Sequence, residues 1–150
     1  MPFSVNYSFT LTLRPKCYIH EPERQYDDTY EYIRRKLSSL SQAFTIIAEV
    51  TKSYNVHYHG LISFYYNDNI KLVNNNINQR DFIKEFHKCF RNDTFVGYIK
   101  IDQMRDENNW KAYLKKDLEH TMNAINRRPL IWDFFDWFDS EERAIYGITW

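Results

Sequence analysis

Two histidines, His57 and His59, lie two residues apart inside the largely apolar run 56–64. Residues i and i+2 of a strand project from the same face of a sheet, so both imidazoles are expected to point the same way. Imidazole is the commonest metal ligand among protein side chains, and this spacing lets two rings share one divalent ion. The pair therefore predicts a metal site on a strand.

A carboxylate is expected beside this pair. Residues 43–51 and 55–65 predict two strands joined by a short turn at 52–54, which places Glu49 opposite His57 on a shared face. Glu49 is the only acid on its otherwise apolar strand, and such an acid needs a partner. Two imidazoles and one carboxylate leave positions open for water or a phosphate oxygen. A register slip of one residue would separate the three ligands.

Tyr113 and Lys116 form the second motif, inside a helix predicted for residues 107–123. Their spacing puts them on one helix face, with Lys115 rotated away and His120 continuing near the same side. A phenol is protonated near neutral pH and is a weak nucleophile; a neighbouring ammonium and a metal-polarised phosphate would offset that weakness. Together the two motifs predict nucleophilic chemistry on a phosphodiester. The alternative is a tyrosine that only anchors its helix.

The elements that must position these residues follow from hydrophobic periodicity. Residues 3–13 alternate apolar and polar, which predicts a long half-buried strand ended by Pro15. The remaining expectations are strands at 43–51, 55–65 and 95–103, helices at 27–42, 79–90 and 107–123, an Asn-rich loop at 67–78 and a final helix opened by Pro129. This order predicts an α+β fold, with a ferredoxin-like split β-α-β antiparallel sheet and additional C-terminal helices.

The predicted domain is residues 1–128, and residues 129–150 are expected to form an aromatic and acidic helix packed on it. Residues 1–130 hold 19 Lys and Arg against 15 Asp and Glu, whereas residues 131–150 hold one Arg against five Asp and Glu. A basic body with an acidic tail is compatible with nucleic-acid binding, and a solvated mixed surface is the plain alternative.

The first strand offers weaker candidates for DNA contact. Thr10 and Thr12 face away from its apolar side, where their hydroxyls could contact a DNA backbone or pair with the neighbouring strand; the structural interpretation is favoured. Arg14 and Lys16 follow at the end of the strand and could bind phosphate, and Lys115 is a further candidate.

Composition excludes several classes of protein. The sequence has no run of the ~20 apolar residues that a membrane span needs, and its start shows no basic segment followed by an apolar one. We therefore expect a protein that is neither membrane-bound nor secreted. Cys17 and Cys89 follow no metal-binding spacing and are expected to be reduced thiols.

Taken together, these segments resemble the HUH endonuclease domain of replication initiator (Rep) proteins from circular single-stranded DNA viruses and rolling-circle plasmids. Three ordered motifs and one upstream acid carry the resemblance over residues 3–120: Phe9-Thr10-Leu11-Thr12, Glu49, His57-Tyr58-His59 and Tyr113-Leu114-Lys115-Lys116. Residues 1–128 would then be the endonuclease domain. Viral initiators usually continue into a helicase, which is not seen here, and the neutral net charge is unusual for a DNA-processing domain.

The resemblance implies site-specific nicking and joining of single-stranded DNA that initiates rolling-circle replication. Mg²⁺ or Mn²⁺ would be held by Glu49, His57 and His59. Tyr113 would attack the scissile phosphate, leaving a 3′-OH and a 5′-phosphotyrosine. Lys116 would position the phosphate, stabilise charge or help to deprotonate the tyrosine. The implied partners are a replication origin, expected to be a hairpin, and a helicase domain or protein. The implied location is the host cell interior, or the nucleus of a eukaryotic host.

Three alternatives remain open. A single-tyrosine HUH transposase has similar size, but its tyrosine motif usually has Gln where this chain has Lys116. A non-catalytic ferredoxin-like RNA-binding module needs stacking aromatics on its central strands, where this chain has His57 and His59. A structural zinc site would have too few ligands and no nearby cysteine.

Overall fold

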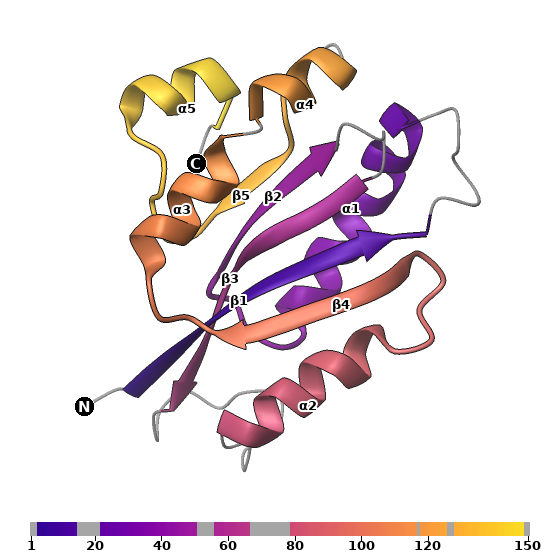
Figure 1. The fold of residues 1–150 in the computed structure, drawn as a ribbon, viewed down its shortest axis with the longest axis vertical. Coiled ribbons are helices and arrows are strands. Elements are labelled where there is room, and N and C mark those ends of the chain that lie inside the picture. Colours follow the sequence, from indigo (N-terminus) through magenta and orange to yellow (C-terminus); the bar gives the residue numbers. More distant parts are fainter. Residues whose placement is uncertain are drawn as a thin grey trace.

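The computed structural model describes residues 3–14, 22–50, 56–66, 79–116, 118–125 and 128–148. Within these ranges the strands are β1 (Phe3–Leu13), β2 (Phe44–Val50), β3 (Val56–Tyr66), β4 (Val96–Gln103) and β5 (Ile131–Asp133), and the helices are α1 (Pro22–Ser38), α2 (Gln79–Phe90), α3 (Glu107–Lys115), α4 (Leu118–Ile125) and α5 (Ser140–Tyr146). The strands form one antiparallel sheet in the order β4-β1-β3-β2-β5 (Figure 1). This arrangement confirms the predicted α+β fold.

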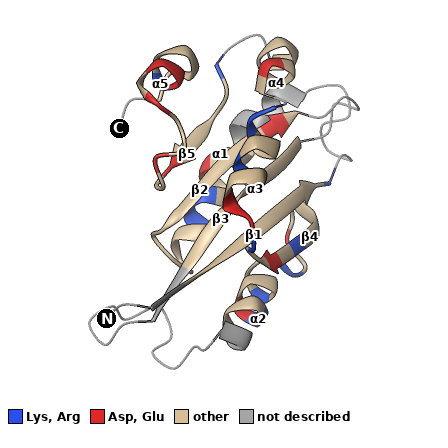
Figure 2. Ribbon diagram, turned by 60° about the vertical axis from the view of Figure 1, so that its left-hand side comes forward, with Lys and Arg blue, Asp and Glu red and all other residues tan. Residues whose placement is uncertain are grey.

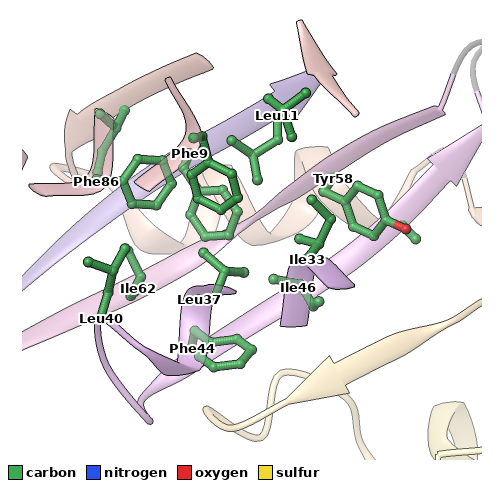
Figure 3. Close-up of a cluster of buried hydrophobic side chains, with 14 of the residues drawn as sticks. Phe9, Leu11, Ile33, Leu37, Leu40, Phe44, Ile46, Tyr58, Ile62 and Phe86 are labelled. Carbon is green, nitrogen blue, oxygen red and sulfur yellow. The ribbon is translucent and has the colours of Figure 1, made fainter. Parts of the chain in front are cut away.

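One face of the sheet packs against α1 and α2. The alternation of β1 turns one set of its side chains into this core, because successive strand residues point to opposite faces. The two helices contribute apolar side chains at helical spacing, as predicted. Figure 3 shows part of this cluster, whose buried members include Phe9, Leu11, Ile33, Leu37, Phe44, Ile46, Tyr58, Ile62 and Phe86.

The opposite face carries the predicted ligands and is only partly covered. A second buried cluster joins the sheet to the C-terminal third of the chain: Ile47, Leu61, Leu114, Leu118, Ile131, Trp137, Phe138 and Ile148. Helices therefore lie on both faces of the sheet, and in Figure 1 α3, α4 and α5 gather on the side of β5 and β2, away from α2. On the β1–β4 side, Tyr98 is 59% exposed and Lys100 and Asp102 are also exposed.

Two helix predictions were wrong. The helix expected at 107–123 is divided into two: α3 ends at Lys115, and α4 begins at Leu118. The helix expected from Pro129 onward is replaced by β5, in which Ile131 pairs with Ile47 of β2. Within the described part of this tail, residues 128–148, only 140–146 are helical. The periodic apolar residues around Phe134 and Phe135 favoured a helix locally, but the open edge of β2 offers hydrogen bonds that only a strand can take.

The tail packs on the same sheet through β5 and through one buried acid. Asp133 is 2% exposed, and its carboxylate accepts hydrogen bonds from the backbone N–H groups of Trp137 and Phe138. Arg143 of α5 reaches the same carboxylate at 3.3 Å. These bonds turn the chain sharply after β5 and set α5 against α3.

Several predicted segments lie outside the described residues: Pro15, Lys16, Cys17, the turn at 52–54 and the loop at 67–78. Within the described ranges, no helix has both the length and the apolar character that crossing a membrane requires.

Candidate active site

Glu49, His57 and His59 lie on the same face of the sheet, as their spacing predicts. Glu49 pairs with His57 across β2 and β3, and His59 follows two residues later on β3. On the other side of β3, Thr12 pairs with His57 and Thr10 pairs with His59. Directly paired residues of antiparallel strands share a face. The two threonines therefore project toward the histidines.

His59 is held by hydrogen bonds at both ring nitrogens. Its Nε2 lies 3.3 Å from Oε2 of Glu49, and its Nδ1 lies 3.0 Å from Oγ1 of Thr10. A hydroxyl can donate or accept, so Thr10 can pair with either tautomer of the ring. Orienting the second nitrogen in this way is what the neighbours of metal-binding histidines usually do. The sequence had favoured strand pairing for Thr10 and did not predict this role.

The charges of the cluster suit a cation. Burial acts to raise the pKa of the Glu49 carboxyl, but the hydrogen bond from His59 and the charges of His59, His57 and His120 lower it overall. Burial lowers the pKa of His57, and His59 lowers it further, while Glu49 opposes them. Both shifts favour the forms that bind a metal, an ionised carboxylate at Glu49 and a neutral imidazole at His57.

The donor set fits a divalent ion in residue type, and its three members share one face of the sheet. The ring centroids of His57 and His59 are 5.7 Å apart, and Glu49 reaches His59 from the neighbouring strand. Among the described residues, however, no three His, Cys, Asp or Glu side chains already converge as a set of ligands does. Binding an ion here requires the contact between Glu49 and His59 to open, with both groups turning toward the ion.

Tyr113 stands on α3 beside these residues. Its ring centroid is 6.1 Å from that of His59, and the two rings are nearly perpendicular at 88°. The side chain is 48% exposed, so its hydroxyl is accessible to a large substrate. The structure thus brings the predicted nucleophile next to a predicted metal ligand.

Trp110 fixes that placement, and the sequence analysis had assigned it only to the apolar stripe of its helix. Its ring stacks on Tyr113 at 5.4 Å with 15° between the planes, and its Nε1–H donates a 3.0 Å hydrogen bond to the carbonyl oxygen of Gly60. The indole therefore ties the tyrosine to the strand residue that follows His59. An aromatic residue one helical turn before the tyrosine was the available signal.

The two lysines of the motif have separate environments. The Lys116 ammonium lies 4.9 Å from the centroid of the Tyr113 ring, as expected for residues on one helix face. Lys115 turns to the other side, where its ammonium contacts Glu142 of α5 at 3.1 Å and lies 4.5 Å from the centroid of the Phe138 ring. Lys115 thus holds α5 against α3 and is not presented toward Tyr113.

Two adjoining hollows flank Tyr113 on the β1–β4 side. The smaller, about 260 Å³, is lined by Ser8, Phe9, Thr10, Lys100, Asp102, Trp110 and Tyr113. The larger, about 600 Å³, shares its tyrosine wall and is lined further by Gln103, Met104, Arg105, Asp106 and Asn109. Both have an aromatic wall and polar rims, which suits a nucleotide unit better than a purely apolar ligand.

The remaining candidates for DNA contact are spread out. Thr12 is half-buried opposite His57, and Arg14 is exposed at the end of β1, where its Nε donates to the carbonyl oxygen of Asp93. Lys16 lies outside the described residues. Figure 2 shows basic and acidic residues interspersed over the fold, with acids prominent on α5.

Comparison with family models, with curated proteins and with solved structures finds no match for this chain.

Proposed function

We propose that this chain is a metal-dependent, site-specific nickase and strand transferase for single-stranded DNA, of the HUH type, that initiates rolling-circle replication. One observation carries the proposal. An exposed tyrosine, Tyr113, stands 6.1 Å from the ring of His59, over a sheet face that also holds Glu49 and His57. A nucleophile beside a set of metal ligands is the arrangement that covalent phosphoryl transfer requires.

Tyr113 is the nucleophile in this mechanism. Its phenolic oxygen attacks phosphorus, the bond from phosphorus to the 3′ oxygen breaks, and that oxygen takes a proton to leave as a 3′-OH. The 5′ end stays on the tyrosine as a phosphodiester, and the phenolic proton passes to a base or to solvent. The ammonium of Lys116, beside the same ring, stabilises the charge that develops on the phosphate.

Glu49, His57 and His59 are the residues that would hold Mg²⁺ or Mn²⁺, which supplies Lewis-acid polarisation of the scissile phosphate when bound. Thr10 keeps the ring of His59 in position through its 3.0 Å contact with Nδ1. Trp110 keeps the phenol over the site through its stack and its bond to Gly60.

The DNA strand would cross the open β1–β4 side of this face. The hollows beside Tyr113 present the indole of Trp110 and the ammonium of Lys100, and Tyr98 is exposed on the same strand as Lys100. Aromatic faces and cations together are what single-strand binding sites use. Lys115 is left out of this interface because it is paired with Glu142.

The setting we propose is the interior of a host cell, in the nucleus where the host is eukaryotic. The partner is a hairpin-bearing origin, with unwinding supplied by a helicase domain or protein.

A nicking assay tests the proposal through the predicted ligands. Labelled hairpin oligonucleotides with a randomised single-stranded loop are incubated with the protein and Mn²⁺, and cleavage is followed on denaturing gels. The wild type should nick a subset of the pool. His57→Ala should abolish nicking with its fold intact, because the half-buried His57 contributes little to the core; circular dichroism checks this.

His87→Ala is the matched control and should nick like the wild type. His87 is exposed on α2, the helix that packs on the face of the sheet opposite the predicted ligands. Full nicking by the wild type in excess chelator would contradict the proposal. So would binding to single-stranded RNA without any nicking of DNA, which would favour the RNA-binding alternative.

A further inference from the structure

His120 lies on α4 near the carboxylate of Glu49. The hydroxyl of its neighbour Thr121 accepts a 3.1 Å hydrogen bond from the backbone N–H of Val50, the residue after Glu49, and Thr121 is fully buried. This bond joins α4 to the end of β2. It brings an imidazole that lies outside the predicted ligand set to the same corner of the fold.

One nitrogen of His120 has an unusual environment. Nε2 is buried, and no hydrogen-bond partner for it is present among the described residues. A buried nitrogen left unpaired loses its hydrogen bond to water without replacement, so native structures rarely retain one without a reason. The neighbouring groups show what that reason is.

His120 shares its electrostatic surroundings with the predicted ligands, although no three of these groups converge as a set of ligands in the described part of the chain. The charges of His59, His57 and His120 all act on Glu49, although the sequence has only five histidines. Of the other two, His87 is exposed on α2 and His20 lies outside the described residues. An imidazole nitrogen without a donor and an ionised carboxylate both present lone pairs, and a cation placed among them satisfies both at once.

We propose that His120 is a fourth protein ligand of the divalent ion, joining Glu49, His57 and His59. This inference rests on the metal site of the proposed function and extends its ligand set. Three nitrogens and one carboxylate form a softer site than Mg²⁺ prefers, because Mg²⁺ favours oxygen ligands and keeps several waters. The site should therefore favour Mn²⁺ and Zn²⁺ over Mg²⁺.

Direct metal titration of the full chain, stripped of metal, tests the assignment without any DNA. Mn²⁺ binding is followed by electron paramagnetic resonance for the wild type, His120→Ala, His57→Ala and the control His87→Ala. We expect His120→Ala to weaken Mn²⁺ binding about 10- to 100-fold, the range seen when residues supporting a metal site are removed. It should also bring the affinities for Mn²⁺ and Mg²⁺ closer together. His87→Ala should bind like the wild type.

A second measurement does not depend on any variant folding. In wild-type protein labelled with ¹⁵N at histidine, stoichiometric Zn²⁺ should shift the ring-nitrogen resonances of His57, His59 and His120 and leave those of His87 unchanged. An unmoved His120 resonance, or wild-type Mn²⁺ affinity in His120→Ala while His57→Ala fails to bind, would overturn the inference and leave the proposed function standing. Equal and negligible Mn²⁺ binding by the wild type and His57→Ala would remove both.

Discussion

Trp110 and Tyr113 act as one unit at the scale of single residues. The indole stacks on the phenol and is anchored by its hydrogen bond to Gly60, so the direction of the phenol depends on a contact that spans 50 residues of sequence. Chemistry that needs in-line attack is sensitive to displacements of about 1 Å. Trp110 is therefore a positioning residue for the proposed reaction.

Substitution at Trp110 should separate positioning from folding. Trp110→Phe keeps a ring for stacking but loses the bond to Gly60, at a cost of about 1 kcal/mol in the free energy of unfolding. Trp110→Ala loses both contacts and should slow single-turnover nicking by roughly 100-fold, with DNA affinity changed much less. Ile145→Ala, at an exposed site on α5, is the control. Equal nicking rates for Trp110→Ala and the wild type would show that the stack does not position the phenol.

The sequence correctly placed Glu49, His57 and His59 on one face of the sheet but missed the contacts that hold them. Glu49 and His57 could be placed opposite each other because a short turn between two strands fixes their register. The bonds from Thr10 to His59 and from Trp110 to Gly60 depend on how β1 and α3 pack against β3. Those packing geometries are tertiary, and no local pattern encodes them.

Among the elements, β3 carries the site and needs a glycine directly after His59. A Cβ on Gly60 would overlap the carbonyl oxygen of Thr45 and meet the ring of Phe9 at 2.9 Å. The close approach of β2 to β3 at this point therefore excludes any side chain. That approach helps to bring Glu49 and His59 together.

Gly60→Ala should consequently destabilise the protein strongly. Overpacking against backbone typically costs about 1–3 kcal/mol or more, and urea unfolding measures it. Gly97→Ala is the matched control on β4, because its Cβ would approach closely the flexible side chain of Arg14, at 3.0 Å, and would meet backbone only at ordinary contact distances of 3.7 and 3.9 Å. If both variants unfold at the same urea concentration as the wild type, the strands are less closely packed at Gly60 than the structure shows.

The errors in element prediction also have a physical cause. Apolar residues at Ile131, Phe134, Phe135 and Phe138 recur at helical spacing, yet β5 completes the edge of the sheet beside β2. Inter-strand bonds and the buried Asp133 outweigh local periodicity there, as tertiary contacts often do. The sequence expectation treated residues 107–123 as one helix, although the chain changes direction after Lys115.

The whole molecule combines a charged open face with a tail whose charges are largely paired internally. Lys115 contacts Glu142, and Arg143 contacts Asp133 and Asp136. These two cations therefore compensate much of the negative charge of the tail. The order of β1 to β4, by contrast, follows from the predicted split β-α-β pattern, which restricts how four such strands can pair, whereas β5 was not predicted.

DNA affinity should fall as salt rises, because each phosphate contact releases counterions. Lys100→Ala, which removes a cation beside Tyr113, should reduce the slope of log affinity against log salt by about one. Lys88→Ala, an exposed site on α2, should leave it unchanged. Fluorescence anisotropy with a single-stranded hairpin measures both slopes. An affinity independent of salt would argue against a phosphate-binding surface.

The central claim is that Tyr113 becomes covalently joined to DNA, and mass spectrometry of the reacted protein tests it most directly. After the wild type has cleaved hairpin DNA in the presence of Mn²⁺, the protein should yield a peptide carrying a 5′-phosphodiester at Tyr113. An added strand with a 3′-OH should then be joined to the bound fragment without ATP, since the phosphotyrosine retains much of the energy of the broken bond. Tyr113→Phe should bind DNA and metal normally and form no adduct. Nicking by Tyr113→Phe, or products with free 5′-phosphates and no adduct, would show that water is the nucleophile and would contradict this account.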